Sequence, residues 1–401
     1  MLRRDEVPRV KFFEPSTDPA EGLGVLMLFR LIEESVGAFF QPDRPIHVTR
    51  APGRLDVLGG RAPGADALTL QMPIAEGACV AIQPRTDTLV RLWSPCRDGS
   101  RTQMLSMDLR DLGVPDRPID AEEARALFLP DARDRWAGYL LGALLALVRG
   151  GRVMPTHGAE LLLHSDIPEA AGVASSSAIT LAALRAFARL YGVNLSDDEQ
   201  VQACVMVERD FVAAPSRGAD VRALLHAEPG ELVMLQGERF VGSVPLPSDL
   251  EIVGLDSGVL PRGERGGDAG PGDDDALAQR FRSLLAAEPS LVKRTELGDQ
   301  LFLAHAAYAS SGRSEAATDF LVEQAKLRRA AGGAVLGAKA TGRGGGGTVV
   351  LLGEHGKVWY EALRIKKALL QHTGHSAHVF RWSSPGALSF DAIDLRPTAK
   401  G

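Results

Sequence analysis

Glycine is the residue that most constrains this chain, because its placement fixes where the backbone can turn tightly. The 401 residues include 43 glycines and 24 prolines. The densest run lies between Gly337 and Gly347, and two further segments, 51–54 and 168–178, combine glycine with alanine, proline or serine. Glycine lacks a Cβ, so such segments let the backbone approach another group closely. These three places are therefore the first candidates for a binding or catalytic site.

Composition places the chain among ordinary globular proteins. Hydrophobic residues make up 45% and charged residues 24%, near the averages for such proteins. The length suits one large domain or two smaller ones. A chain of this length buries enough hydrophobic core to fold without covalent cross-links. The 45 basic and 51 acidic side chains give a net charge of −6. This charge argues against binding nucleic acid or anionic membranes through bulk electrostatics.

The cysteine content and the N-terminal residues indicate the cellular compartment. The three cysteines form no metal-binding spacing, and their odd number predicts a reducing compartment without a disulfide framework. Arg3 and Arg4 are followed by acidic residues and Pro8, which does not resemble a signal peptide. The longest apolar run, 136–148, is too short to cross a bilayer. We expect a cytoplasmic protein with neither a membrane nor a nucleic acid as partner.

Apolar periodicity predicts both helices and strands. Helices are predicted at 24–40, 136–148, 176–191, 315–331 and 358–371. Strands are predicted at 46–49, 68–83, 160–164, 231–235, 240–245, 250–255, 349–352 and 377–380, and a mobile loop at 258–275. This mixture predicts an α+β protein with a boundary near residues 221–231. We divide the chain into domains 1–225 and 226–401.

The glycine run contains Gly342-x-Gly344-x-x-Gly347, which formally matches a dinucleotide fingerprint. That fingerprint requires a helix directly after it, whose N-terminus binds the pyrophosphate. Residues 348–352 are β-branched and apolar, so a strand is predicted there instead. The chain also lacks the Gly-x-x-x-x-Gly-Lys-Ser/Thr pattern of a P-loop.

The other two segments suit anion binding. Segment 168–178 places small residues and three serines before an amphipathic helix, where free backbone amides can face an anion and hydroxyls can contact Mg²⁺. The alternative is a serine that caps an ordinary helix. Segment 51–54 is predicted to be a turn that presents Arg54 after a strand. Arginine can bridge phosphate oxygens, but a lone arginine beside a turn is usually a surface residue.

Taken together and in this order, the three segments resemble the motifs of the GHMP kinase family. Residues 51–60, extended by 70–74, resemble the first motif, 168–178 the phosphate-binding second motif, and 337–348 the third. Segments 254–258 and 383–387 favour the sugar-kinase branch, which includes the kinase domain of the arabinokinases and the galactokinases. The resemblance covers most of the chain, from about 46 to 387.

The resemblance implies a fold and an activity. The family fold has an N-terminal lobe like ribosomal protein S5 domain 2 and a ferredoxin-like C-terminal lobe, with substrates in the cleft between them. The family transfers the γ-phosphoryl group of ATP, with Mg²⁺, to a hydroxyl of a small molecule. For this branch we expect the anomeric C1 hydroxyl of a monosaccharide that is arabinose-like, galactose-like or acidic.

The resemblance also assigns residues. Segment 214–220 ends in Asp220, the expected catalytic base, and Arg54 is expected beside it, keeping it ionised and stabilising the transferred group. Ser176 and Glu208 are expected to contact Mg²⁺. Expected ATP contacts are Gly172, Val173, Ala174, Ser175, Ser176, Trp136 and Tyr139, and expected substrate contacts are Gly60, Arg61, Asp220, Gly344 and Gly345.

Each assignment has a structural alternative. Asp220 could cap a helix or turn, Glu208 could lie on a solvated helix face, and Trp136 and Tyr139 could be core aromatics of one helix. The matches of the flanking residues to the family favour the assigned roles over these alternatives.

Several positions depart from the family pattern. Arabinokinase-like sequences have an aspartate that helps to hold the sugar, followed by a tyrosine, and this chain has Pro63 and Gly64 at these positions. Other departures are Ala170, Ala174, Arg217, Val221 and segment 259–266. Two hypotheses follow. One is an active kinase with an altered sugar-like substrate, in which Arg61 binds an acidic group of that substrate. The other is a non-catalytic relative that binds nucleotide or sugar as a sensor or partner-binding protein.

Overall fold

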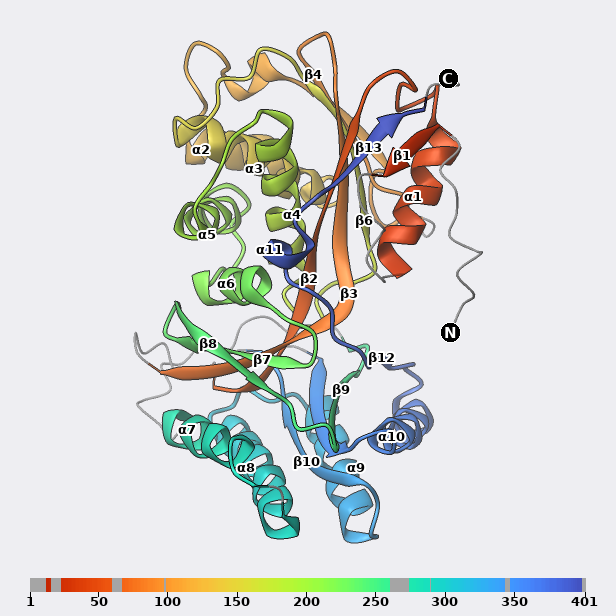
Figure 1. The fold of residues 1–401 in the computed structure, drawn as a ribbon, viewed down its shortest axis with the longest axis vertical. Coiled ribbons are helices and arrows are strands. Elements are labelled where there is room, and N and C mark those ends of the chain that lie inside the picture. The colour runs from red at the N-terminus through yellow and green to blue at the C-terminus, as the bar shows by residue number, and fades with distance from the viewer. Residues whose placement is uncertain are drawn as a thin grey trace.

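The structure is a computed structural model and describes residues 12–15, 23–59, 67–96, 99–259, 274–288, 290–342 and 347–398. A large upper part and a smaller lower part each contain one β-sheet with helices packed against it (Figure 1). This arrangement confirms the predicted α+β class.

The large sheet contains most of the strands. They are β1 (Phe13–Pro15), β2 (Ile46–Leu58), β3 (Leu68–Pro84), β4 (Leu89–Trp93), β5 (Met104–Asp108), β6 (Ala159–Ser165), β7 (Glu231–Gln236), β8 (Arg239–Pro245) and β13 (Ile393–Pro397). Their order is β1-β13-β2-β3-β6-β4-β5, and β7 and β8 extend the sheet from β3. The long central strands β2 and β3 run from the upper part down to the lower part (Figure 1).

Helices cover both faces of this sheet, because alternate side chains of β3 enter different cores. Ala78, Val80 and Ile82 pack with α3 (Arg135–Arg149) and α4 (Ser175–Leu190). Cys79 and Ala81 pack on the other face with α1 (Leu23–Ser35). The remaining helical elements of this part are α2 (Ala121–Phe128), α5 (Asp197–Met206), α6 (Gly218–His226), α11 (Ala387–Phe390), the 3₁₀ helix η2 (Leu109–Leu112) and the π-helical turn η3 (Val207–Phe211).

The small sheet has the order β10-β11-β9-β12, with all described pairs antiparallel. Its strands are β9 (Leu250–Asp256), β10 (Val335–Ala340), β11 (Thr348–Glu354) and β12 (His378–Phe380), and its helices are α7 (Asp274–Leu285), α8 (Leu291–Ser310), α9 (Ala316–Ala330) and α10 (Val358–Thr373). Helix α8 approaches β10 very closely: a Cβ on Gly298 would lie 1.9 Å from the carbonyl oxygen of Leu336. Glycine is therefore required at this contact, which supports the strand leading into the third motif.

Some elements differ from the sequence predictions. The strand predicted at 46–49 continues through β2 to Leu58, so segment 51–54 is not a turn after a strand. The predicted helix 24–40 ends at Ser35. Helix α8 was not predicted, because its apolar residues show little periodicity. Most of the loop predicted at 258–275 lies outside the described residues.

The predicted division at residue 225 remains a proposal. Strand pairing crosses it, since β7 pairs with β3 and the C-terminal strand β13 pairs with β2. Among the described residues, no helix has the length and apolarity needed to span a membrane. In the described part of the chain, Cys79, Cys96 and Cys204 form no disulfide.

Candidate active site

Three segments far apart in the sequence meet at one place. The Nη1 atom of Arg54 donates to the carbonyl oxygen of Gly172 at 2.8 Å. The backbone N–H of Asp56 donates to Thr341 Oγ1 at 2.6 Å, and Thr348 Oγ1 donates to the Ala171 carbonyl at 2.8 Å. The three segments that the sequence singled out therefore form one site.

Arg54 lies inside strand β2 at an irregularity in its pairing with β3. The register shifts between Pro52 and Arg54. A Cβ on Gly53 would lie 2.7 Å from Ile74 Cδ1 and 2.9 Å from the Val173 carbonyl oxygen. Only glycine fits there, and it lets the Arg54 N–H donate to the Val173 carbonyl at 3.0 Å. The irregularity thus ties β2 to the loop before α4.

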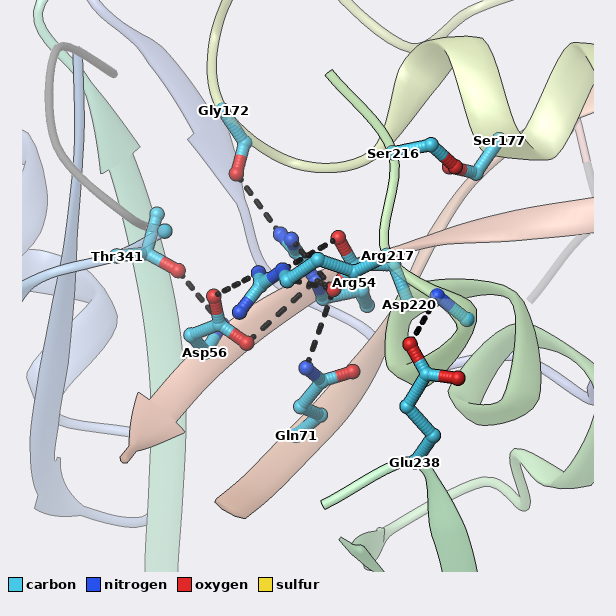
Figure 2. Close-up of polar contacts among 12 residues, drawn as sticks. Arg54, Asp56, Gln71, Gly172, Ser177, Ser216, Arg217, Asp220, Glu238 and Thr341 are labelled. Carbon is cyan, nitrogen blue, oxygen red and sulfur yellow. Dashed lines mark hydrogen bonds and ion pairs between the residues drawn. The ribbon is translucent and has the colours of Figure 1, made fainter. Parts of the chain in front are cut away.

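Asp220 lies in the first turn of α6 and is 9% exposed. The residue before the helix, Arg217, makes no side-chain cap hydrogen bond, and the Asp220 carboxylate points to Arg54 (Figure 2). Arg54 Nη2 and Nε lie 2.9 and 3.2 Å from Asp220 Oδ1. Helix capping therefore does not account for this side chain.

Arg54 and Asp220 belong to a buried ion network of four side chains, shown in Figure 2. Arg217 Nε lies 3.1 Å from Asp220 Oδ2, and Arg217 Nη2 lies 3.0 Å from Asp220 Oδ1 and 3.2 Å from Asp56 Oδ2. Arg54 Nε lies 3.5 Å from Asp56 Oδ1. Gln71, which is opposite Asp56 in the β2–β3 register, donates to Asp220 Oδ1 at 3.3 Å. Two guanidinium groups thus face two carboxylates.

This network sets the ionisation of Asp220. Burial alone would raise the pKa of its carboxyl group, but the charges of Arg217 and Arg54 and hydrogen bonds from Arg54 and Gln71 outweigh it, lowering the pKa to about 2. Asp220 is therefore a carboxylate at neutral pH.

The loop before α4 has the backbone geometry expected of an anion site. Gly172 and Ala174 have positive φ values of 78° and 65°, and α4 begins at Ser175. The N-cap residue is Ala174, which makes no side-chain cap hydrogen bond. The alternative of a serine cap is therefore wrong, and the serines occupy the first turn of the helix. The positive end of the helix dipole lies at this turn.

Glu208 lies beside the same turn, on the π-helical segment η3. Its Oε1 accepts from Ser177 Oγ at 2.9 Å, and its Oε2 accepts from Ser216 Oγ. Burial raises the pKa of Glu208; hydrogen bonds from Ser216, Ser176 and Ser177 oppose this rise, and the charge of Asp220 adds to it. The side chain is fully buried, so the alternative of a solvated helix face is wrong.

The oxygen donors around Glu208 fit the preferences of magnesium. One carboxylate and serine hydroxyls, combined with phosphate oxygens of a substrate, are the kind of set that Mg²⁺ takes in kinases. Within the described part of the chain, no cluster of three or more His, Cys, Asp or Glu side chains could hold a metal alone. The residues that fit a magnesium ion are Glu208 and Ser176.

The remaining predicted site residues either lie in the hydrophobic core or fall outside the described part of the chain. Trp136 is buried in the main core and donates through Nε1 to the Thr102 carbonyl at 2.9 Å. Tyr139 packs on the same core, and burial raises its pKa, as does the charge of Glu208. Their adenine role stays a prediction. Gly60, Arg61, Pro63, Gly64, Gly344 and Gly345 lie outside the described residues.

Sequence reasoning missed several members of the site. Asp56 lies two residues after Arg54 on the same strand, and this period-two spacing could have indicated a shared face. Ser177 follows Ser176 directly. Gln71 lies in segment 70–74, and Ser216 and Arg217 lie in segment 214–220, but nothing in the sequence indicates which partners these side chains contact.

The sequence is similar to those of known proteins. Residues 138–228 match the GHMP kinases N terminal domain. The L-arabinokinase of Arabidopsis thaliana is 24% identical over 90% of this chain and 48% of its own length. The galactokinase of Chloroflexus aurantiacus is 27% identical over 54% of this chain and 50% of its own length.

Solved structures show the same fold. Lactococcus lactis galactokinase complexed with galactose superimposes with a TM-score of 0.73, covering 90% of this chain and 98% of that chain at 19% identity. The mevalonate kinase of Methanococcus jannaschii gives a TM-score of 0.61, with 84% and 98% covered at 18% identity. The matches to the two sequence relatives span about half of those relatives' lengths. The chain therefore contains a GHMP kinase N-terminal domain, has the fold of the GHMP kinases and is homologous to L-arabinokinase and galactokinase.

Proposed function

We propose that this chain is an ATP-dependent sugar kinase. It transfers the γ-phosphoryl group to a hydroxyl of a sugar or sugar-like substrate, with Asp220 as the base and the anomeric C1 hydroxyl of a monosaccharide as the acceptor. The observation that carries the proposal is the Arg54–Asp220 pair, whose arginine also bonds the carbonyl of Gly172 in the loop before α4. Base and phosphate loop are thereby joined through one side chain.

The roles follow from charge and position. The acceptor O–H bond breaks and its proton passes to Asp220, while the oxygen forms a bond to the γ-phosphorus. The bond between the γ-phosphorus and the bridging oxygen breaks, and ADP leaves. Arg54 balances the negative charge of the transferred group. The amides before Ser175 and the hydroxyls of the first turn of α4 hold the phosphates.

The proposal also includes a magnesium ion. Glu208 and Ser176 would hold it, and when bound it neutralises charge on the phosphate oxygens. Ser177 and Ser216 hold both oxygens of Glu208 and so fix the direction of its carboxylate.

A substrate screen tests the proposal. ADP release is measured with Mg-ATP over a panel of pentoses, hexoses and uronic acids, for the unmodified chain and for Asp220→Asn. Sugar-dependent ADP release that the substitution abolishes supports the kinase. If no sugar gives turnover but sugar or nucleotide raises the melting temperature, the chain is instead a non-catalytic binding protein.

A further inference from the structure

Arg217 and Asp220 are the outer members of the ion network. The side chain of Asp56 is fully buried and that of Arg54 is 5% exposed, whereas those of Arg217 and Asp220 are 11% and 13% exposed. These two outer side chains are in hydrogen-bond contact. A ligand that reaches Asp220 therefore lies beside Arg217.

Arg217 has N–H groups that its protein partners do not use. Its Nε donates to Asp220 Oδ2, and its Nη2 lies within ion-pair distance of both Asp56 and Asp220. A guanidinium carries five N–H groups, and Nη1 makes no hydrogen bond to any residue in the described part of the chain. The two N–H groups of Nη1 can therefore serve a ligand that sits against Asp220.

The backbone also leaves this side chain outside the helix. Arg217 directly precedes α6 with extended dihedrals, φ −133° and ψ 128°. The next residue, Gly218, is fixed by a hydrogen bond from its N–H to Glu238 Oε1 at 3.1 Å. The start of α6 is thus anchored on one side, while Arg217 extends from it toward Asp56 and Asp220.

Charge balance indicates what kind of ligand fits. The network holds two guanidinium groups and two carboxylates, so its net charge is zero. When Asp220 accepts the proton of an acceptor hydroxyl, the transferred phosphoryl group faces Arg54, whereas Arg217 keeps Asp56 but loses the charge of Asp220. Losing a charged partner is costly for a buried guanidinium. An anionic group of the acceptor beside Arg217 Nη1 would replace the lost charge of Asp220 through a charge-assisted hydrogen bond.

We propose that Arg217 is a specificity-determining residue that selects a sugar carrying an anionic group, a carboxylate or a phosphate, near the hydroxyl that is phosphorylated. This inference rests on the proposed kinase function and names the class of its acceptor. A neutral sugar can reach Asp220, but it leaves Arg217 without a new partner during transfer. Sites built around a charged donor discriminate against analogues that lack the matching group.

Kinetics on matched sugars test the inference. The acceptors are galactose, galacturonate and galactose 6-phosphate, and the proteins are the unmodified chain, Arg217→Ala, Arg217→Lys and the control Arg239→Ala, an exposed arginine of β8. We expect kcat/KM of the unmodified chain to be higher for one of the two anionic sugars than for galactose, and the identity of that sugar distinguishes carboxylate from phosphate. Arg217→Ala should lower this preference by about tenfold or more, since a charge-assisted hydrogen bond contributes more than 1.4 kcal/mol. Arg217→Lys should retain part of the preference, and Arg239→Ala all of it.

Two outcomes overturn the inference. One is a preference of the unmodified chain for galactose over both anionic sugars. The other is an equal loss on neutral and anionic sugars in Arg217→Ala, which would place Arg217 on the transferred phosphoryl group or on Asp220 alone. Thermal melting of each variant identifies losses that come from unfolding.

The failure of the kinase proposal would be seen separately, as the absence of turnover with every acceptor. In that case calorimetric titration with galacturonate and galactose 6-phosphate decides the inference. Binding that is weakened by Arg217→Ala but not by Arg239→Ala upholds anion selection at this site. Equal binding by all four proteins, or none by the unmodified chain, rejects it.

Discussion

Arg54 holds Asp220 through two nitrogen atoms that converge on one carboxylate oxygen: Nη2 lies 2.9 Å and Nε 3.2 Å from Oδ1. The third nitrogen, Nη1, donates to the Gly172 carbonyl. One side chain of β2 thus fixes the first turn of α6 against the loop before α4. This relationship makes the ionisation and position of Asp220 depend on residues more than a hundred positions away in the sequence.

Asp220→Asn should remove turnover while retaining nucleotide binding. An amide of the same shape cannot accept the acceptor proton, and loss of a general base typically lowers turnover by about 10²–10⁴-fold. ADP release measures turnover, and the shift in melting temperature with Mg-ATP measures nucleotide binding. Unchanged turnover in this variant would remove Asp220 from the mechanism.

The ion network should make a pH-dependent contribution to stability. The pKa of Asp220 in the folded chain, about 2, lies below its ordinary value of 3.8. Its contribution is therefore fully present above pH 3.8 and is lost as the pH falls toward 2. The groups that face it are Arg54, Arg217 and Gln71, with Glu208 acting through its charge.

Urea denaturation between pH 3 and 7 measures this contribution. The free energy of unfolding of the unmodified chain should exceed that of Asp220→Asn by on the order of 2 kcal/mol at neutral pH. The difference should stay constant down to about pH 4 and shrink below it. A difference that grows toward pH 3 would contradict the lowered pKa.

Glu208→Gln should stabilise the metal-free chain at neutral pH and weaken its response to magnesium. Burial raises the pKa of Glu208 above its ordinary 4.5. Stability of the unmodified chain therefore falls as the pH rises from 4.5 through the folded pKa, because the buried group must ionise. Glutamine removes this cost and also the carboxylate proposed to bind magnesium.

Melting temperatures with and without MgCl₂ and ATP check this prediction. The magnesium concentration that gives half-maximal turnover should rise in Glu208→Gln. The control is Glu323→Gln, whose side chain is 59% exposed on α9 beside Lys326. An identical magnesium requirement in Glu208→Gln and Glu323→Gln would show that Glu208 holds no metal.

Ala174→Gly should stabilise the loop before α4. Ala174 has a φ of 65°, a left-handed conformation that costs an L-residue roughly 1–2 kcal/mol and glycine almost nothing. We expect the free energy of unfolding to rise by about 1 kcal/mol, after allowing for the greater freedom of glycine in the unfolded chain. Ala178→Gly, inside α4, is the matched control and should have the opposite sign. Urea denaturation measures the change in the free energy of unfolding for both variants. Destabilisation by Ala174→Gly would contradict a strained left-handed conformation at residue 174.

Much of the fold was predictable, because apolar periodicity reports local structure directly. Helices α3, α4, α9 and α10 and most of the predicted strands lie within a few residues of their expected bounds, whereas strands β1, β4, β5, β10 and β13 were not predicted. The errors have physical causes. Pro52 and Gly53 normally indicate a turn, but β2 continues through them because its partner β3 absorbs the irregularity in register. Helix α8 buries the polar Gln300 and His305 while Leu291, Val292 and Leu303 are exposed, so its sequence shows no clear amphipathic face.

From the sequence alone, the order of three motifs indicated the family, and with segment 214–220 it identified Arg54 and Asp220 as candidate site residues. How these residues are held depends on the tertiary structure. Asp56 and Gln71 are adjacent across a β-ladder, and Arg217 lies between two carboxylates that are 164 positions apart in the chain. Local sequence encodes backbone conformation and burial, whereas ion pairing depends on which distant side chains the packed sheet and helices bring within about 3 Å. For that reason the sequence could identify the proposed base, but not the second arginine that pairs with it.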